Sequence, residues 1–138
     1  MNEDDALARF GLHPTAEALV EVRALLEEQT SRERRSQGEG DTELMRLFCV
    51  QLFNAGRVED SLLVWSAKTA SMDANASIDL RLLCGAGLAE TKEFLAQQSG
   101  SAAGRALDRI AAHEAIGEFE GFVVGDATAE YEAYYRDP

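Results

Sequence analysis

The stretch from Leu44 to Phe53 reads LMRLFCVQLF, and only Arg46 and Gln51 interrupt its apolar residues. A helix that is apolar nearly all round is buried by its neighbours on every side. The tripeptide NAG, ending at Gly56, breaks this pattern, and apolar residues at helical spacing resume directly after it. We therefore expect a central helix and an antiparallel return helix, folded about Gly56.

Glycines punctuate the chain at a nearly regular spacing after this point. Gly87 follows Gly56 by 31 residues, and Gly117 follows Gly87 by 30. Each comes at the end of a helical pattern, where glycine adopts the left-handed conformation without a steric penalty. We expect all three to end helices. On this alignment, residues 73–77 join two hairpins and residues 78–86 form the first helix of the second hairpin.

The remaining elements follow from capping residues and apolar spacing. We expect helices over residues 3–10, from 14 to about 32, and over 88–98, 101–114 and 127–136. Residues 1–138 then form a single compact all-α domain of about six or seven helices in antiparallel hairpins. The middle is repeat-like, in the manner of tetratricopeptide or HEAT repeats.

Two segments differ from these helices in composition. Residues 31–41 contain no apolar residue and carry two glycines, so we expect a mobile loop. Residues 119–138 hold half of the chain's aromatic residues. A terminal segment of this kind covers the open end of a helical stack, and we expect it to be an aromatic C-terminal cap.

The negative net charge of the chain disfavours some classes of binding partner. A net charge of −12 disfavours contact with a phosphate backbone, so we expect no nucleic-acid partner. The chain has no apolar run of membrane-spanning length, and its acidic first residues do not fit a signal peptide, which favours a cytoplasmic protein without a membrane partner. Cys49 and Cys84 lie among apolar neighbours and are expected to be buried thiols.

We find no constellation of residues that indicates a chemistry. His13 and His113 are not at metal-ligand spacing from a cysteine or from each other. The sequence GAG ending at Gly87 lacks the third glycine of a dinucleotide fingerprint and follows a helical pattern. We therefore expect no metal, no cofactor and no catalytic residue, and the sequence leans against an enzyme.

Acidic residues surround the C-terminal aromatic residues. The candidate interaction surface consists of Glu118, Glu120, Glu130, Glu132 and Tyr134. Exposed aromatic side chains are typical anchors of protein interfaces, and acids around them attract a basic partner. The alternative is that the aromatic residues only dock the terminal segment onto the helices.

The segment from Leu52 to Trp65 resembles one tetratricopeptide-type hairpin, with Gly56 at the turn, Ser61 at the helix crossing and Trp65 in the aromatic position. The longer run through residues 79–87 (DLRLLCGAG) is similar to uncharacterised small helical proteins of actinobacteria. The resemblance implies helical hairpins and a role in protein binding.

Four functional hypotheses remain open, the fourth being a purely structural homo-oligomer. The first is a non-catalytic acidic helical module that binds another protein, with a basic protein favoured. The second is an immunity or antitoxin protein that neutralises a basic toxin. The third is a small-ligand binder or an enzyme with its site between helical hairpins, which a polar pocket and a perturbed carboxylate would favour.

Overall fold

The computed structural model describes residues 1–136, and every regular element in that range is helical. The all-α prediction for a single compact domain is confirmed. The elements are α1 (Glu3–Phe10), α2 (Ala16–Arg35), α3 (Thr42–Ala55), the 3₁₀ helix η1 (Val58–Asp60), α4 (Ser61–Lys68), α5 (Met72–Ser77), the 3₁₀ helix η2 (Leu80–Cys84), α6 (Leu88–Gln97), α7 (Ser101–Ala115) and α8 (Val124–Arg136).

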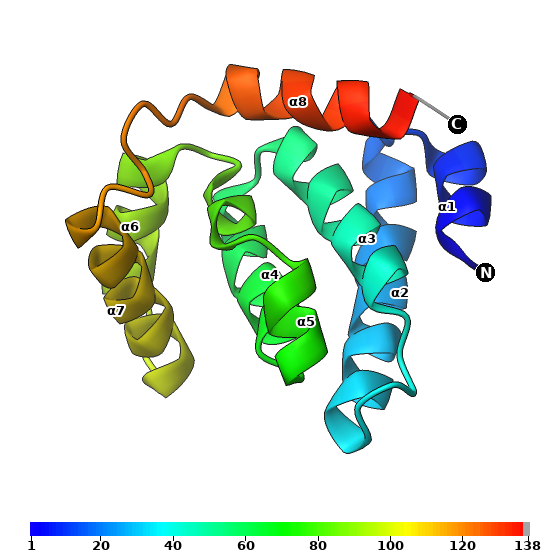
Figure 1. Cartoon of the computed structure of the whole chain (residues 1–138), viewed down its shortest axis with the longest axis horizontal. Coiled ribbons are helices and arrows are strands. Elements are labelled where there is room, and N and C mark those ends of the chain that lie inside the picture. The colour runs from blue at the N-terminus through cyan, green and yellow to red at the C-terminus, as the bar shows by residue number, and fades with distance from the viewer. Residues whose placement is uncertain (137–138) are drawn as a thin grey trace.

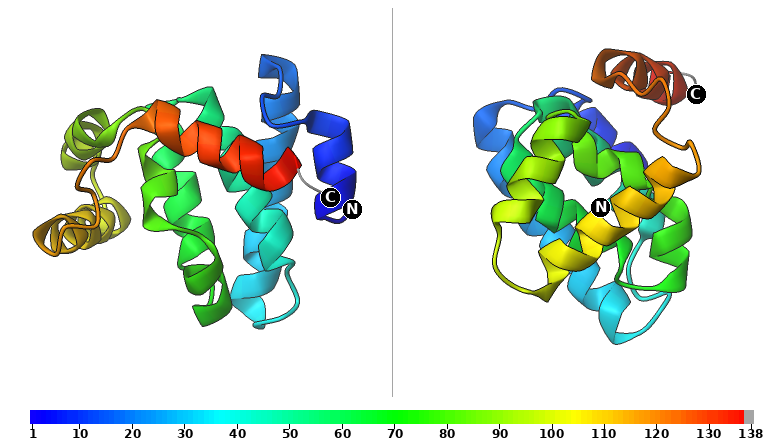
Figure 2. Two further views of the ribbon diagram at one scale, coloured as in Figure 1. Left: turned by 45° about the horizontal axis from the view of Figure 1, so that its top comes forward. Right: turned by 90° about the vertical axis from the view of Figure 1, so that its left-hand side faces the viewer.

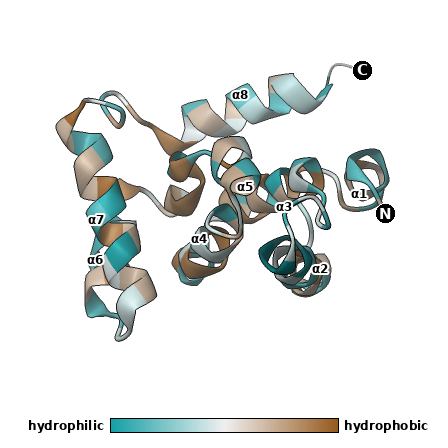
Figure 3. Ribbon diagram, turned by 60° about the horizontal axis from the view of Figure 1, so that its bottom comes forward, coloured by the Kyte–Doolittle hydropathy of each residue, from teal (hydrophilic) through white to brown (hydrophobic). Residues whose placement is uncertain are grey.

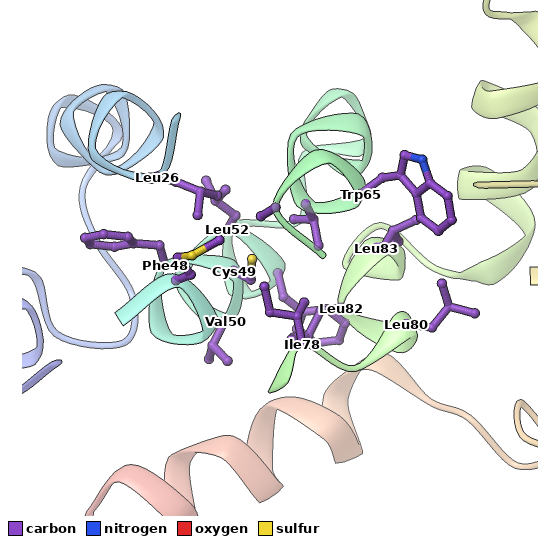
Figure 4. Packing of buried hydrophobic residues seen from close by; sticks show 14 of the residues in the cluster. Leu26, Phe48, Cys49, Val50, Leu52, Trp65, Ile78, Leu80, Leu82 and Leu83 are labelled. Carbon is purple, nitrogen blue, oxygen red and sulfur yellow. The ribbon is translucent and has the colours of Figure 1, made fainter. Parts of the chain in front are cut away.

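Helix α3 lies at the centre of the core, as its sequence predicts. All residues from Leu47 to Phe53 are buried, including the polar Gln51. Gln51 satisfies its amide nitrogen by donating to the Gly11 carbonyl oxygen at 2.8 Å. Figure 4 shows the α3 side chains meeting those of α2, α4 and the η2 segment around Cys49. Both Cys49 and Cys84 are buried free thiols.

The other helices pack in sequence order on either side of α3. Helix α2 packs against α3, α4 against α5, and α6 against α7. Figure 1 shows these three pairs side by side, with α8 crossing their upper ends from the α7 side toward α1. The two rotated views of Figure 2 agree that α8 lies over one end of the helices.

Gly56 ends α3 in the predicted way, with φ 71° and ψ 22°, and its N–H donates to the Leu52 and Phe53 carbonyl oxygens. The chain then turns back through η1 into α4, which packs against η2 and α2. Gly117 also has a positive φ just after α7. The prediction for Gly87 is wrong, because this glycine precedes α6 rather than ending an α-helix.

The segment after α4 differs from its prediction. Residues 73–77, expected as a connection, belong to α5, and the helix expected over 78–86 is only the 3₁₀ helix η2. The cause is capping: the Ser71 side chain accepts from the Ala74 N–H and starts α5 early, and the Asp79 side chain starts η2. Met72 is 83% exposed and does not continue the apolar face of α4.

The loop predicted over 31–41 is shorter, because α2 continues to Arg35. The prediction is wrong for residues 31–35. The remaining turn is held by α2 itself: the Glu33 carboxylate accepts from the backbone N–H groups of Gly38 and Gly40, and Gln29 accepts from that of Asp41.

The C-terminal segment packs across the helices. Its last helix begins at Val124, three residues before the predicted Ala127. Helix α8 buries no residue completely, but Tyr131 packs edge-on against Phe53 of α3, with 5.9 Å between ring centroids. Thr128 Oγ1 donates to Asn54 Oδ1 of α3 at 3.1 Å. Residues 137 and 138 of the predicted cap lie outside the described residues.

Candidate functional site

The structure brings together part of the predicted interaction surface. Glu118 and Glu120 on the α7–α8 connection and Glu130 on α8 line one hollow of about 130 Å³. Asp126, which the sequence analysis did not select, is a fourth acidic residue of its lining. We call Glu118, Glu120, Asp126 and Glu130 the acidic hollow. Its only basic residue is Arg81.

The charge of Arg81 is already balanced by a neighbour. Its guanidinium donates to both carboxylate oxygens of Asp79, with 2.8 Å from Nη2 to Oδ2. The hydrogen bond to Asp79 raises the pKa of Arg81, and burial opposes this less strongly. Burial would raise the pKa of Asp79, but its hydrogen bonds from Arg81 outweigh burial and lower it. The hollow therefore keeps an excess of negative charge.

Buried aromatic residues fix the connection that carries Glu118 and Glu120. Phe119, between them, is buried, and it packs edge-on against Phe122 with 5.8 Å between ring centroids. Phe122 in turn packs edge-on against Phe53 of α3. These contacts anchor the connection to the core while the two neighbouring carboxylates remain exposed.

One exposed apolar side chain, that of Val123, lines the acidic hollow. Ile116 is 71% exposed and Val123 is 55% exposed, at either end of the connection. Figure 3 shows the end of this connection coloured hydrophobic where it enters α8. Exposed apolar residues beside charged ones are a common composition of protein interfaces.

The other two predicted residues lie farther along α8 and face different partners. Glu132 is 3.9 Å from His13, which precedes α2. Tyr134 accepts a hydrogen bond from Arg46 of α3 at 3.0 Å, and this pair borders a separate pocket of about 240 Å³. Tyr134 is 59% exposed and stays accessible at the end of the surface. The structure therefore groups three of the five predicted residues.

A second polar pocket, of about 380 Å³, was not predicted from the sequence. It lies where the ends of α4, α5 and α7 meet, and its lining includes Lys68, Asp79, His113 and Glu118. Lys68 was missed because a lysine at the end of a helical pattern is usually solvated. It becomes buried where α5 packs against α4, a contact that no local sequence pattern predicts.

Comparisons with known proteins do not assign a family: no family model, no curated protein and no solved structure matches the chain. Among residues 1–136, no group of three or more His, Cys, Asp or Glu side chains is placed to hold a metal ion. None of the helices described in that range is both long enough and apolar enough to cross a membrane.

Proposed function

We propose that this protein is a non-catalytic interaction module whose acidic hollow binds a basic segment of another protein. The observation that carries the proposal is the imbalance of charge in the hollow, where four carboxylates face one guanidinium that Asp79 already pairs. A lysine or arginine side chain of a partner would supply the missing positive charge.

The surroundings of the hollow support the same partner. From Ile110 to Tyr135 the chain has no lysine or arginine, so this segment brings no further cationic side chain to the hollow. Exposed Val123 lines the hollow and offers apolar contact area, and Ile116 is exposed at the start of the same connection. A basic segment that also carries apolar side chains would therefore match this surface better than a purely basic one.

The anchoring of the connection gives the surface a defined shape. Phe119 and Phe122 pack against each other beneath the connection, and Thr128 of α8 is hydrogen-bonded to Asn54 of the central helix. A partner that binds a preformed surface loses less conformational entropy than one that must order a loop. The charges then contribute mainly to the rate of association and to specificity.

Backbone amide NMR tests this proposal. The probe is a short peptide in which lysine and leucine alternate, added at about physiological salt. We expect the largest shift changes in residues 116–130, and weaker changes at higher salt. Shift changes spread evenly over the other acidic surfaces, such as those at Glu27 and Glu39, would contradict the proposal.

A further inference from the structure

Lys68 is the one lysine of the chain with a buried side chain, since it is only 6% exposed. Its Nζ donates to the carbonyl oxygens of Asn75 at 2.7 Å and of Ile78 at 2.6 Å, at the end of α5. Lys68 also lines the 380 Å³ pocket. The amine is thus held in place beside that pocket.

The surroundings of Lys68 make its ammonium easier to deprotonate than that of an exposed lysine. Burial lowers its pKa, and the positive charge of Arg109 on α7 lowers it further, while Asp79 and Cys49 oppose these effects. His113 and Glu118 are the other titratable residues of the pocket lining. A neutral amine has two N–H bonds and one lone pair. Because both N–H bonds can be donated to the two carbonyl oxygens, the lone pair is left for the pocket.

His113 provides a base in the same pocket. Its Nδ1 pairs with Glu118, whose carboxylate fixes the tautomer with the proton on Nδ1. The other ring nitrogen, Nε2, is then the proton acceptor. A nucleophile and a base that a carboxylate orients are the parts that nucleophilic acyl transfer requires.

We propose that Lys68 is an acyl-accepting amine and that its pocket admits a small acyl phosphate, of which acetyl phosphate is the simplest example. Nζ attacks the carbonyl carbon, a C–N bond forms, and the C–O bond to phosphate breaks. Inorganic phosphate leaves with the electron pair of that bond, and His113 takes the proton that Nζ gives up. Arg109 contacts Asn75 of the pocket lining at 3.5 Å and so lies beside the pocket, where its charge favours the phosphate group.

Acylation also changes the contacts of α5. An amide nitrogen has one N–H, so one of the two carbonyl oxygens at Asn75 and Ile78 loses its partner. Asn75 belongs to α5, and Ile78 and Asp79 connect α5 to η2. Modified protein should therefore unfold at a lower temperature than unmodified protein.

The experiment uses the only other lysine as an internal control. Lys92 lies on α6, where its ammonium pairs with Glu114 at 2.9 Å and remains partly exposed. The whole protein is treated with acetyl phosphate near neutral pH, and acetylation at Lys68 and Lys92 is followed by peptide mass spectrometry. We expect Lys68 to react at least about tenfold faster than Lys92, and the two rates to become equal after denaturation. Faster or equal reaction of Lys92 in the native protein would overturn the proposal.

Two variants separate this reactivity from a purely structural role of Lys68. His113→Gln removes the base, and it should slow Lys68 severalfold without changing the rate at Lys92. Arg109→Gln should slow the reaction of Lys68 with acetyl phosphate more than its reaction with an uncharged acyl donor such as N-acetoxysuccinimide. A Lys68 rate that neither variant changes would show that His113 and Arg109 play no part, and would overturn the proposed site.

Discussion

The Arg23 guanidinium on α2 forms a bidentate pair of hydrogen bonds with the Asp60 carboxylate, from Nε to Oδ1 at 2.8 Å and from Nη2 to Oδ2 at 3.0 Å. The pair ties α2 to the turn that follows α3. Because Asp60 is 8% exposed, water cannot fully replace its partner. Asp60→Asn removes the charge and one acceptor, and should lower the free energy of unfolding by about 2 kcal/mol. Urea denaturation measures the free energy of unfolding, and a loss within error of zero would contradict this role of the Arg23–Asp60 pair.

Glu33 holds the turn after α2 from inside the protein. It is 1% exposed, and it accepts from Ser71 Oγ as well as from the N–H groups of Gly38 and Gly40. A glutamine there keeps one acceptor oxygen and places an NH₂ group against donors. We expect Glu33→Gln to lower the free energy of unfolding by about 1–3 kcal/mol. The exposed Glu39→Gln is the matched control and should change it by less than about 0.5 kcal/mol.

The same carboxylate predicts a dependence on pH. Burial would raise the pKa of Glu33, but the hydrogen bonds from Ser71, Gly38 and Gly40 outweigh burial and lower it below its ordinary 4.5. A group whose pKa is lower in the folded protein stabilises the fold above the unfolded-state pKa. The stability gap between wild type and Glu33→Gln should thus be constant near neutral pH and narrow as the pH falls below about 4.5. A gap that widens in acid would reverse the assignment.

Two glycines should respond to alanine with opposite signs. Gly56 has a left-handed φ of 71°, and an added Cβ would meet nothing closer than the Gly85 carbonyl oxygen at 3.6 Å. Gly56→Ala should therefore destabilise the protein by about 1 kcal/mol through backbone conformation alone. Gly104 lies inside α7 with open space at its Cβ position. Gly104→Ala should stabilise by about 0.5–1 kcal/mol. Thermal unfolding of both variants checks the pair, and shifts of the same sign would contradict it.

Local sequence was sufficient for the centre of the fold. The run from Leu44 to Phe53 has no polar face, so it can only be buried, and Gly56 is followed by a new helical pattern that requires a turn. Local sequence predicted the helices after Lys68 less well. The sequence predicts that the next helix begins near residue 78, whereas the structure starts α5 after Ser71, whose hydroxyl also donates to Glu33 on α2.

The candidate sites divide in the same way. Glu118, Glu120 and Glu130 could be selected because acids lie among aromatic residues in one short segment. The pocket at Lys68 could not, because Lys68, Asp79 and His113 come from separate elements whose packing brings them together. The burial of Glu33 was missed for the same reason, since its partner Ser71 is 38 residues away.

The proposed binding depends on the acidic hollow rather than on the overall negative charge of the protein. The double variants Glu120→Gln/Glu130→Gln and Glu27→Gln/Glu39→Gln have equal net charge and separate these two contributions to the affinity for a basic segment. Glu118 is left unchanged because it also pairs with His113.

Fluorescence anisotropy measures the Kd of each variant for the labelled lysine–leucine peptide at about physiological salt. We predict that the hollow variant binds about tenfold more weakly than wild type, and that the control variant stays within about twofold. Equal losses of affinity in the two variants would contradict the claim.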